Sequence, residues 1–166
     1  MELPKEKQTT LGLYVTSKEA YDLWKNSPEN VKILDVRTFD EYIYVGHAPM
    51  AWNIPAFLQT TQWDAEKQYF TYKMSPDFVN QIKDVFEPND TILVTCRSGG
   101  RSALAANFMA KLGYKNVYNI TDGFEGDNVD DPESVYYGKR MKNGWKNAGV
   151  PWTYKIDVDL VKIPSE

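Results

Sequence analysis

Short apolar segments alternate with helix-like segments along most of the chain. This alternation is typical of α/β folds, in which helices connect the parallel strands of one sheet. We therefore predict an open sheet of about five mostly parallel strands with helices on both faces. Its centre should be residues 91–95, which form a continuous apolar run. The expected strands are 11–15, 31–36, 50–54, 91–95 and 116–120.

Local signals mark where the connecting helices begin and end. The T-x-x-E patterns at 16–19 and 38–41 are capping boxes, which predict helix starts at these two places. The Ser-Pro pair at 75–76 predicts a third start, for a helix that runs to about residue 85. A fourth helix is expected from about residue 100 to the glycine at 113. Its apolar face should hold Leu104, Ala105, Phe108 and Leu112.

Two segments interrupt the alternation, and we interpret both as insertions on a compact core. Residues 56–74 are rich in aromatic side chains and predict a hairpin that turns at about 64–67. Residues 125–143 change from acidic to basic with little periodicity. The tail, residues 152–166, predicts a terminal edge strand because apolar and charged residues alternate in it. At least one insertion should border the crevice of the functional site.

Length and charge limit the classes of protein that this chain can belong to. Its 166 residues favour one domain, residues 1–166. The net charge of -4 argues against nucleic acid as a partner, and no apolar run approaches the ~20 residues of a membrane span. The first ten residues lack the apolar segment of a signal peptide, but a signal removed earlier would leave no trace. A cytoplasmic or a periplasmic location therefore stays open.

The chain has one cysteine, Cys96, and it directly follows the expected central strand. A single cysteine excludes an internal disulfide and a cysteine-based zinc site. In an open α/β sheet, the crevice beyond the ends of the strands is where ligands bind. Backbone amides of the glycine-rich loop, the start of the next helix and the charges of Arg97 and Arg101 all favour a thiolate. The pattern predicts a nucleophilic cysteine.

The loop sequence "CRSGGR" (96–101) resembles the active-site loop of the rhodanese family of sulfurtransferases. Further similarity follows in the same order, in "ILDVRTFDEYIYVGHAPMAWNIP" (33–55), "LGYKNVYNITDGF" (112–124) and "WKNAGVP" (145–151). The sequence departs from the family pattern at 48–49, where Ala-Pro stands, and at Asp122, which replaces a glycine. Some animal thiosulfate sulfurtransferases have a lysine at the position of Ser98.

This resemblance implies a rhodanese-type sulfurtransferase that acts through a persulfide on Cys96. The implied donor is a small anion, thiosulfate or polysulfide, and the acceptor is a thiol or cyanide; a protein acceptor is compatible with the same loop. No metal or organic cofactor is needed. The residues implied in substrate binding are Arg97, Ser98, Gly99, Gly100, Arg101 and Ser102.

Three other interpretations stay open at this point. A cysteine phosphatase or arsenate reductase also holds a thiolate in an anion cradle, but its C-x5-R loop is one residue longer than the loop closed by Arg101. A non-catalytic binding module is disfavoured because the cysteine, both arginines and the glycines are present. A sulfur carrier that passes sulfur between other proteins would have the same loop residues.

Several conspicuous residues have a structural interpretation that we prefer. His47, the only histidine, should make a structural hydrogen bond rather than a Cys–His dyad. Asp35 and Arg37 should form a structural ion pair. The aromatic residues of 56–74 should belong to the core and rim of an insertion, and the basic run 139–142 should be a solvated face.

Overall fold

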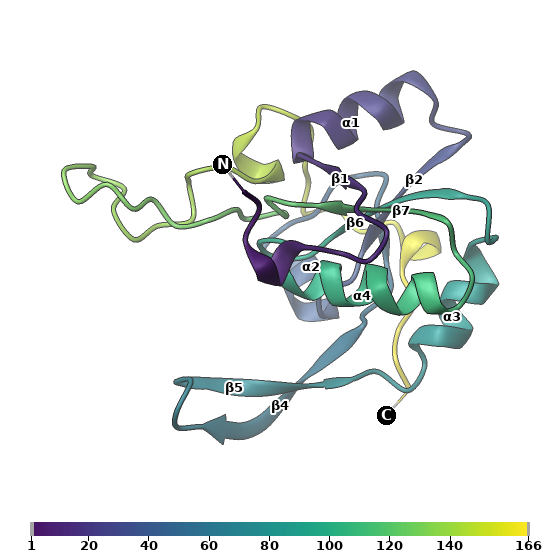
Figure 1. Cartoon of the computed structure of the whole chain (residues 1–166), viewed down its shortest axis with the longest axis horizontal. Coiled ribbons are helices and arrows are strands. Elements are labelled where there is room, and N and C mark those ends of the chain that lie inside the picture. Colours follow the sequence, from purple (N-terminus) through teal and green to yellow (C-terminus); the bar gives the residue numbers. More distant parts are fainter. Residues whose placement is uncertain (1, 166) are drawn as a thin grey trace.

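A computed structural model describes residues 2–165 of the chain. Its main sheet has five strands in the order β1-β7-β6-β2-β3, and all neighbouring strands are parallel (Figure 1). The predicted sheet is confirmed, although its outer strands are shorter than expected. The strands are β1 (Tyr14–Val15), β2 (Val31–Asp35), β3 (Trp52–Asn53), β6 (Thr91–Thr95) and β7 (Asn116–Ile120).

Strand β6 lies at the centre of this sheet and is buried on both faces. Ile92 and Val94 point into one hydrophobic core, whereas Leu93 points into the other. This alternation follows from the two-residue period of a strand, so an apolar run without polar interruption can satisfy both faces. The position of residues 91–95 as a central parallel strand is therefore confirmed.

Helices cover both faces of the sheet (Figure 1). The helices are α1 (Ser17–Asn26), α2 (Phe39–Tyr44), α3 (Phe78–Val85) and α4 (Gly100–Lys111). Helices α3 and α4 pack into one core, and α1 packs into the other. Both predicted capping boxes are present, with Thr16 and Thr38 as the N-caps. None of the helices between residues 2 and 165 is long and apolar enough to cross a bilayer.

The prediction that Ser75 caps α3 is wrong. The N-cap is Asp77, and the helix begins at Phe78. Ser75 instead donates its backbone N–H to the carbonyl of Ala56, over 2.8 Å, at the base of the first insertion. The hydroxyl of Ser75 accepts the N–H of Asp77 and its carbonyl accepts the N–H of Phe78, each over 3.4 Å, so the Ser-Pro pair forms the turn that leads into the helix.

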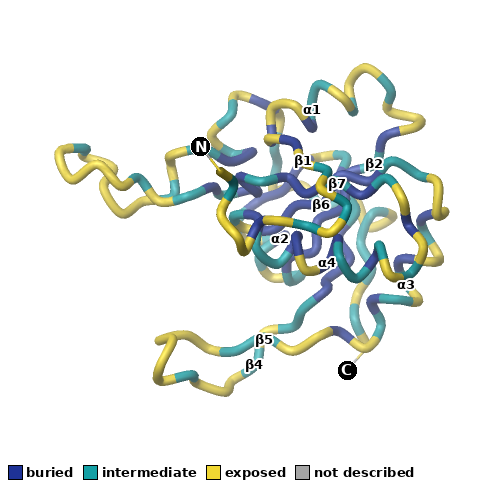
Figure 2. Tube along the Cα trace, in the orientation of Figure 1, coloured by how far each residue is buried: buried dark blue, intermediate teal, exposed yellow. Residues whose placement is uncertain are grey.

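The first insertion forms the predicted hairpin, with strands β4 (Phe57–Asp64) and β5 (Tyr69–Met74). It is a separate two-stranded antiparallel sheet that projects from the core, and its tip is exposed (Figures 1 and 2). The second insertion, 125–143, also lies outside the main sheet and forms only isolated bridges, Asn128 with Arg140 and Val129 with Tyr137. Both predictions that these segments lie outside the main sheet are confirmed.

The predicted edge strand in the tail is wrong. The tail contains a 3-10 turn, η3 (Val158–Leu160), and it meets the sheet only through a bridge between Asn53 and Val161. The neighbouring strand β3 has only two residues, so it offers an edge too short to align a longer strand. The alternation of apolar and charged residues in the tail was therefore not sufficient to form a strand. Two other short 3-10 turns are η1 (Lys5–Lys7) and η2 (Trp145–Asn147).

Candidate active site

Cys96 lies between the carboxyl end of β6 and the start of α4. Only 1% of its surface is exposed, and its side chain packs with the core beneath α4. The sulfur nevertheless lines a surface pocket. The backbone N–H of Gly99 donates a hydrogen bond to Sγ over 3.1 Å. The thiol is thus held at the base of a pocket with a backbone donor directed at it.

Gly99 can occupy this position because it has no side chain. Its φ of +107° lies in the left-handed region, and a Cβ atom there would come within 2.6 Å of the carbonyl oxygen of Thr121. The tight turn at Gly99 brings its amide to the sulfur. It also starts α4 at Gly100, as predicted.

The first amides of α4 add further donors at this loop. The first helical bond runs from the N–H of Ala103 to the carbonyl of Gly99, so the N–H groups of residues 100–102 precede the helical ladder. These groups carry the positive end of the helix dipole. Backbone groups of this kind stabilise an anion at a helix N-terminus.

A buried network holds Ser102 beside the sulfur. Asn119 donates its Nδ2 group to the carbonyls of Lys7 and Gly99, which fixes its Oδ1 atom toward Ser102. Ser102 Oγ donates to this Oδ1 over 2.6 Å and lies 3.3 Å from Cys96 Sγ. A serine hydroxyl has one proton, so in this arrangement the thiol donates to Ser102. On ionisation of Cys96, a rotation of the hydroxyl would turn the Ser102 proton toward sulfur.

The backbone at the start of the second insertion is hydrogen-bonded to the cysteine loop. Phe124 donates its N–H to the carbonyl of Cys96 over 2.8 Å, and Glu125 and Gly126 donate theirs to the carbonyl of Arg97. Gly123 packs so closely that a Cβ atom would lie 2.5 Å from the Arg97 carbonyl. Backbone hydrogen bonds and close packing therefore join residues 123–126 to the loop.

Asp122, a departure from the family pattern, has a structural role. Its Oδ1 accepts hydrogen bonds from the backbone N–H and the hydroxyl of Ser17, and its Oδ2 accepts the N–H of Gly144. These contacts join the end of β7 to the start of α1 and to the end of the second insertion.

Arg101 forms a bidentate ion pair with Glu41 of α2, at 2.7 and 2.8 Å. Burial acts to raise the pKa of Glu41, but the hydrogen bonds and charge of Arg101 outweigh it, so the pKa lies below its ordinary value. The Arg101 guanidinium also lies 4.8 Å from the ring centre of Tyr72 in the hairpin. Much of its charge is thus matched by a carboxylate, while its position still borders the pocket.

Arg97 and Arg140 provide the positive charge that is not matched in this way. Arg97 is exposed, lines the pocket and forms no ion pair with any residue in the described range 2–165. The guanidinium of Arg140 donates a hydrogen bond to the carbonyl of Gly126. The N–H of Gly126 in turn donates to the backbone carbonyl of Arg97. Burial and the charge of Arg97 lower the pKa of Arg140. The prediction of a solvated basic run is therefore wrong for Arg140, which is half-buried, and correct for Lys139 and Lys142, which are exposed.

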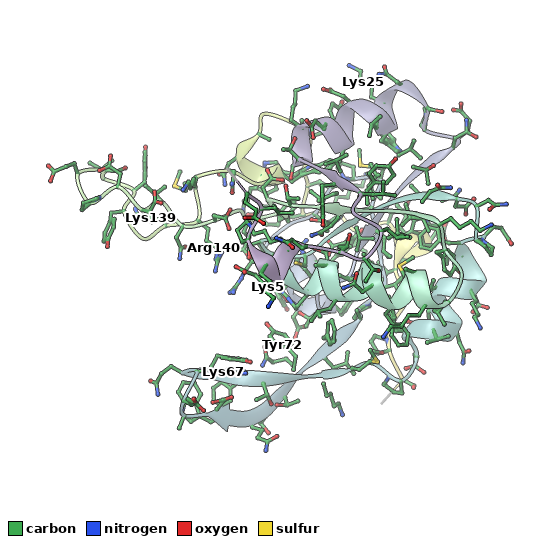
Figure 3. All side chains as sticks on the ribbon, in the orientation of Figure 1. Lys5, Lys25, Lys67, Tyr72, Lys139 and Arg140 are labelled. Carbon is green, nitrogen blue, oxygen red and sulfur yellow. The ribbon has the colours of Figure 1, made fainter. Side chains whose placement is uncertain are left out.

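The pocket has a volume of about 700 Å³ and lies between the cysteine loop and the hairpin. The predicted border between an insertion and the crevice is confirmed. Tyr72 lies on the hairpin strand that faces the rest of the molecule (Figure 3). The prediction that Leu104 belongs to the buried face of α4 is wrong: 57% of its surface is exposed, and it lines the pocket. The hairpin supplies Gln59, Trp63, Tyr69, Phe70 and Tyr72, and the loop and α4 supply Cys96, Arg97, Ser98, Gly100, Arg101 and Leu104.

His47 and the Asp35–Arg37 pair have the structural roles that the sequence predicted. Both ring nitrogens of His47 lie within hydrogen-bond distance of backbone carbonyls, those of Tyr42 and Lys155. Neither nitrogen is directed at the thiol. Arg37 and Asp35 form a fully buried ion pair at 2.7 Å.

Among the residues that support the cysteine loop, the sequence analysis did not identify Glu41, Asn119 and Arg140. Glu41 was recognised only as part of a capping box, and its pairing with Arg101 joins positions 60 residues apart. Asn119 carried a signal, since an amide within an apolar strand must find buried partners. Arg140 carried no local signal that separated it from Lys139 and Lys142.

Comparison with known proteins agrees with this geometry. The family model described as "Rhodanese-like domain" matches residues 17–128. The uncharacterised RP600 homologue of Rickettsia rickettsii is 36% identical over 84% of this chain and 96% of its own length. Thiosulfate sulfurtransferase 18 of Arabidopsis thaliana is 39% identical over 55% of this chain and 62% of its own length.

A solved structure has the same fold. Rv0390 from M. tuberculosis superimposes with a TM-score of 0.64 over 85% of this chain and 96% of its own, at 24% identity.

Proposed function

Since the chain belongs to the rhodanese-like domain family, we propose that it is a sulfurtransferase that carries sulfur on Cys96. The observation that carries this proposal is the position of Sγ, at the base of an open pocket with the Gly99 amide directed at it. The name of the Arabidopsis relative gives thiosulfate as a first donor to test.

In the first half-reaction, the Cys96 thiolate attacks the outer sulfur of thiosulfate. A bond forms between Sγ and that sulfur, and the sulfur–sulfur bond of thiosulfate breaks. Its electron pair leaves with sulfite, and Cys96 becomes a persulfide anion. In this proposal, the amides of Gly100, Arg101 and Ser102 stabilise the negative outer sulfur, as donors do in an oxyanion hole.

In the second half-reaction, a thiophilic acceptor attacks the outer sulfur and Cys96 leaves as the thiolate. With cyanide, the product is thiocyanate. Because the chain has no second cysteine, the persulfide cannot resolve as an internal disulfide. The acceptor is therefore external, either a small molecule or a thiol on another protein.

Charge near the loop supports an anionic donor. Arg97 borders the pocket without a carboxylate partner in the described part of the chain, and Arg140 lies behind it. Arg101 is bound to Glu41, so we assign it first to positioning the loop and only then to attracting the donor. Ser98, Gly99, Gly100 and Ser102 complete the proposed substrate-binding loop.

Intact-mass spectrometry tests the proposal directly. Protein incubated with thiosulfate or polysulfide should gain the mass of one or more sulfur atoms, and cyanide should remove this mass and release thiocyanate. Initial rates at varied donor and acceptor should give the parallel lines of a double-displacement reaction. Cys96→Ser should show neither mass gain nor turnover, because a serine hydroxyl does not ionise near neutral pH.

Thr95→Ser, at the end of β6 and next to the nucleophile, is the matched control for a small change beside the loop and should keep the mass gain. An aryl phosphate serves as the opposing substrate. Cys96-dependent hydrolysis of that ester without sulfur loading would replace the proposal with a phosphatase.

A further inference from the structure

One face of the hairpin is aromatic and is turned toward Cys96. Phe70 and Tyr72 are two residues apart in β5, so they project from the same face. Their partners across the hairpin are Trp63 and Gln59, and all four residues line the pocket. The rings of Trp63 and Phe70 pack edge to face, with centroids 5.1 Å apart.

This aromatic face is not buried by the rest of the protein. Trp63 and Phe70 are 49% and 50% exposed, and Leu104 on the opposite wall is 57% exposed. Exposed apolar surface around a hollow marks a binding site more often than a folding core. A hairpin that served only to cover the core would direct these rings inward.

The pocket is much larger than an inorganic donor requires. Pockets of ~300 to 1,000 Å³ hold organic ligands of drug size, and this one has about 700 Å³. Thiosulfate is a single small ion that could occupy only the end of the pocket near Cys96. Aromatic side chains of the hairpin and Leu104 line much of the remaining space, beside Glu6 and Gln59, and these groups offer little to a small dianion.

Few charged side chains border the pocket. Glu6 lines the wall, Arg97 is unmatched in the described range 2–165, and Arg101 is bound to Glu41. An anionic donor can use Arg97 at the loop. The aromatic wall therefore fits the other substrate of the reaction, the sulfur acceptor.

We propose that this pocket selects an organic thiol with an apolar, aromatic body as the sulfur acceptor. The body packs between the Trp63–Phe70 pair and Leu104, and the sulfur reaches Cys96. This inference rests on the proposed function. In the transfer step, the persulfide anion first takes a proton from water. The acceptor thiolate then forms a bond with its outer sulfur, and the bond from that sulfur to Sγ breaks. Cys96 leaves as the thiolate, and the products are the free enzyme and an organic persulfide that keeps the proton.

A single-turnover experiment tests this selection. Cys96 is first loaded with thiosulfate, excess donor is removed, and loss of the sulfur mass is followed with phenylmethanethiol, 2-mercaptoethanol or cyanide. We expect phenylmethanethiol to reach its half-maximal rate at a concentration at least about tenfold lower than 2-mercaptoethanol. Tenfold corresponds to ~1.4 kcal/mol, which burial of a few apolar carbons can supply.

Variants of both walls locate the effect. The ratio of the phenylmethanethiol rate to the cyanide rate should fall about tenfold in Trp63→Ala/Phe70→Ala. Leu104→Asp should lower the same ratio from the opposite wall, and it changes a helical position that is 57% exposed. Tyr44→Ala removes an aromatic ring that is 77% exposed and does not line the pocket, so this control should keep the wild-type ratio.

The outcomes separate this inference from the proposed function. A persulfide that cyanide removes, without preference for the aromatic thiol, would overturn the inference alone. A preference for the aromatic thiol that persists in both Trp63→Ala/Phe70→Ala and Leu104→Asp would also overturn the inference alone. Failure of the wild-type protein to form any persulfide would overturn the proposed function and, with it, this inference.

Discussion

Arg101 and Glu41 join helices α4 and α2 through two parallel hydrogen bonds of 2.7 and 2.8 Å. Their side chains are only 15% and 20% exposed, so solvent screens the pair less than it would on the surface. Glu41 also accepts the hydroxyl of Thr38 at the start of α2. One carboxylate thus fixes a helix start and the arginine that closes the cysteine loop.

The first prediction concerns stability in acid. The folded-state pKa of Glu41 is lowered, so its contribution to stability is present above the unfolded pKa of ~4.3 and is lost as pH falls through the folded value. Glu41→Gln should lower the free energy of unfolding by ~1 to 2 kcal/mol at pH 7 and by little at the most acidic pH where the fold persists. Urea unfolding at both pH values measures the difference. Asp22→Asn, which breaks the exposed pair with Lys18, should cost less than ~0.5 kcal/mol at either pH.

The second prediction concerns catalysis by the same pair. Arg101→Ala should lower kcat/KM for thiosulfate by roughly ten- to a hundredfold, since loss of a charge-assisted contact costs ~1.5 to 3 kcal/mol. Part of the loss should come from Glu41, whose carboxylate is left unpaired beside the anion site. Arg101→Ala/Glu41→Gln should therefore be faster than Arg101→Ala alone. Equal rates for the single and double variants would show that Arg101 acts only through its own charge.

A third prediction concerns Asp122, which ties three segments together. Asp122→Ala leaves the N–H groups of Ser17 and Gly144 without this acceptor, so the free energy of unfolding should fall by ~2 to 4 kcal/mol. Thermal and urea unfolding both report this change. The control, Asp159→Ala, removes an exposed carboxylate in the tail and should change stability by less than ~0.5 kcal/mol. Equal stability of the two variants would contradict the structural role of Asp122.

Local signals were sufficient for much of the fold. The capping boxes at Thr16 and Thr38 and the apolar run of β6 each act within a few residues, so one sequence reveals them. The position of Cys96 then follows, because the end of a central parallel strand is where such sheets form their crevice. The errors at Ser75 and in the tail arose where a distant partner, Ala56 or the short strand β3, decided the local conformation.

The surroundings of the thiol depend on contacts between segments far apart in sequence. Leu104 has the helical spacing of a core residue, but α4 turns it toward the pocket beside the hairpin. Asn119 in β7 accepts a hydrogen bond from Ser102 in α4, which is 17 residues away in the sequence. These pairings leave no periodic pattern within one segment. The sequence therefore predicted the loop and an insertion beside it, but not the individual side chains that surround the thiol.

The last prediction concerns Arg140, which the second insertion brings behind Arg97. Its half-buried guanidinium adds positive charge near the loop, and neutralising it should raise the KM for thiosulfate. We expect Arg140→Gln to raise KM by roughly two- to fivefold, which corresponds to ~0.5 to 1 kcal/mol for a partly screened charge. The effect should shrink between 50 mM and 500 mM salt, because salt screens charges that solvent reaches. Lys139→Gln removes the same charge from the neighbouring, exposed position and should leave KM within twofold at both salt concentrations. If both variants raised KM equally, the net charge of the insertion would explain the effect, and Arg140 would have no particular place in the site.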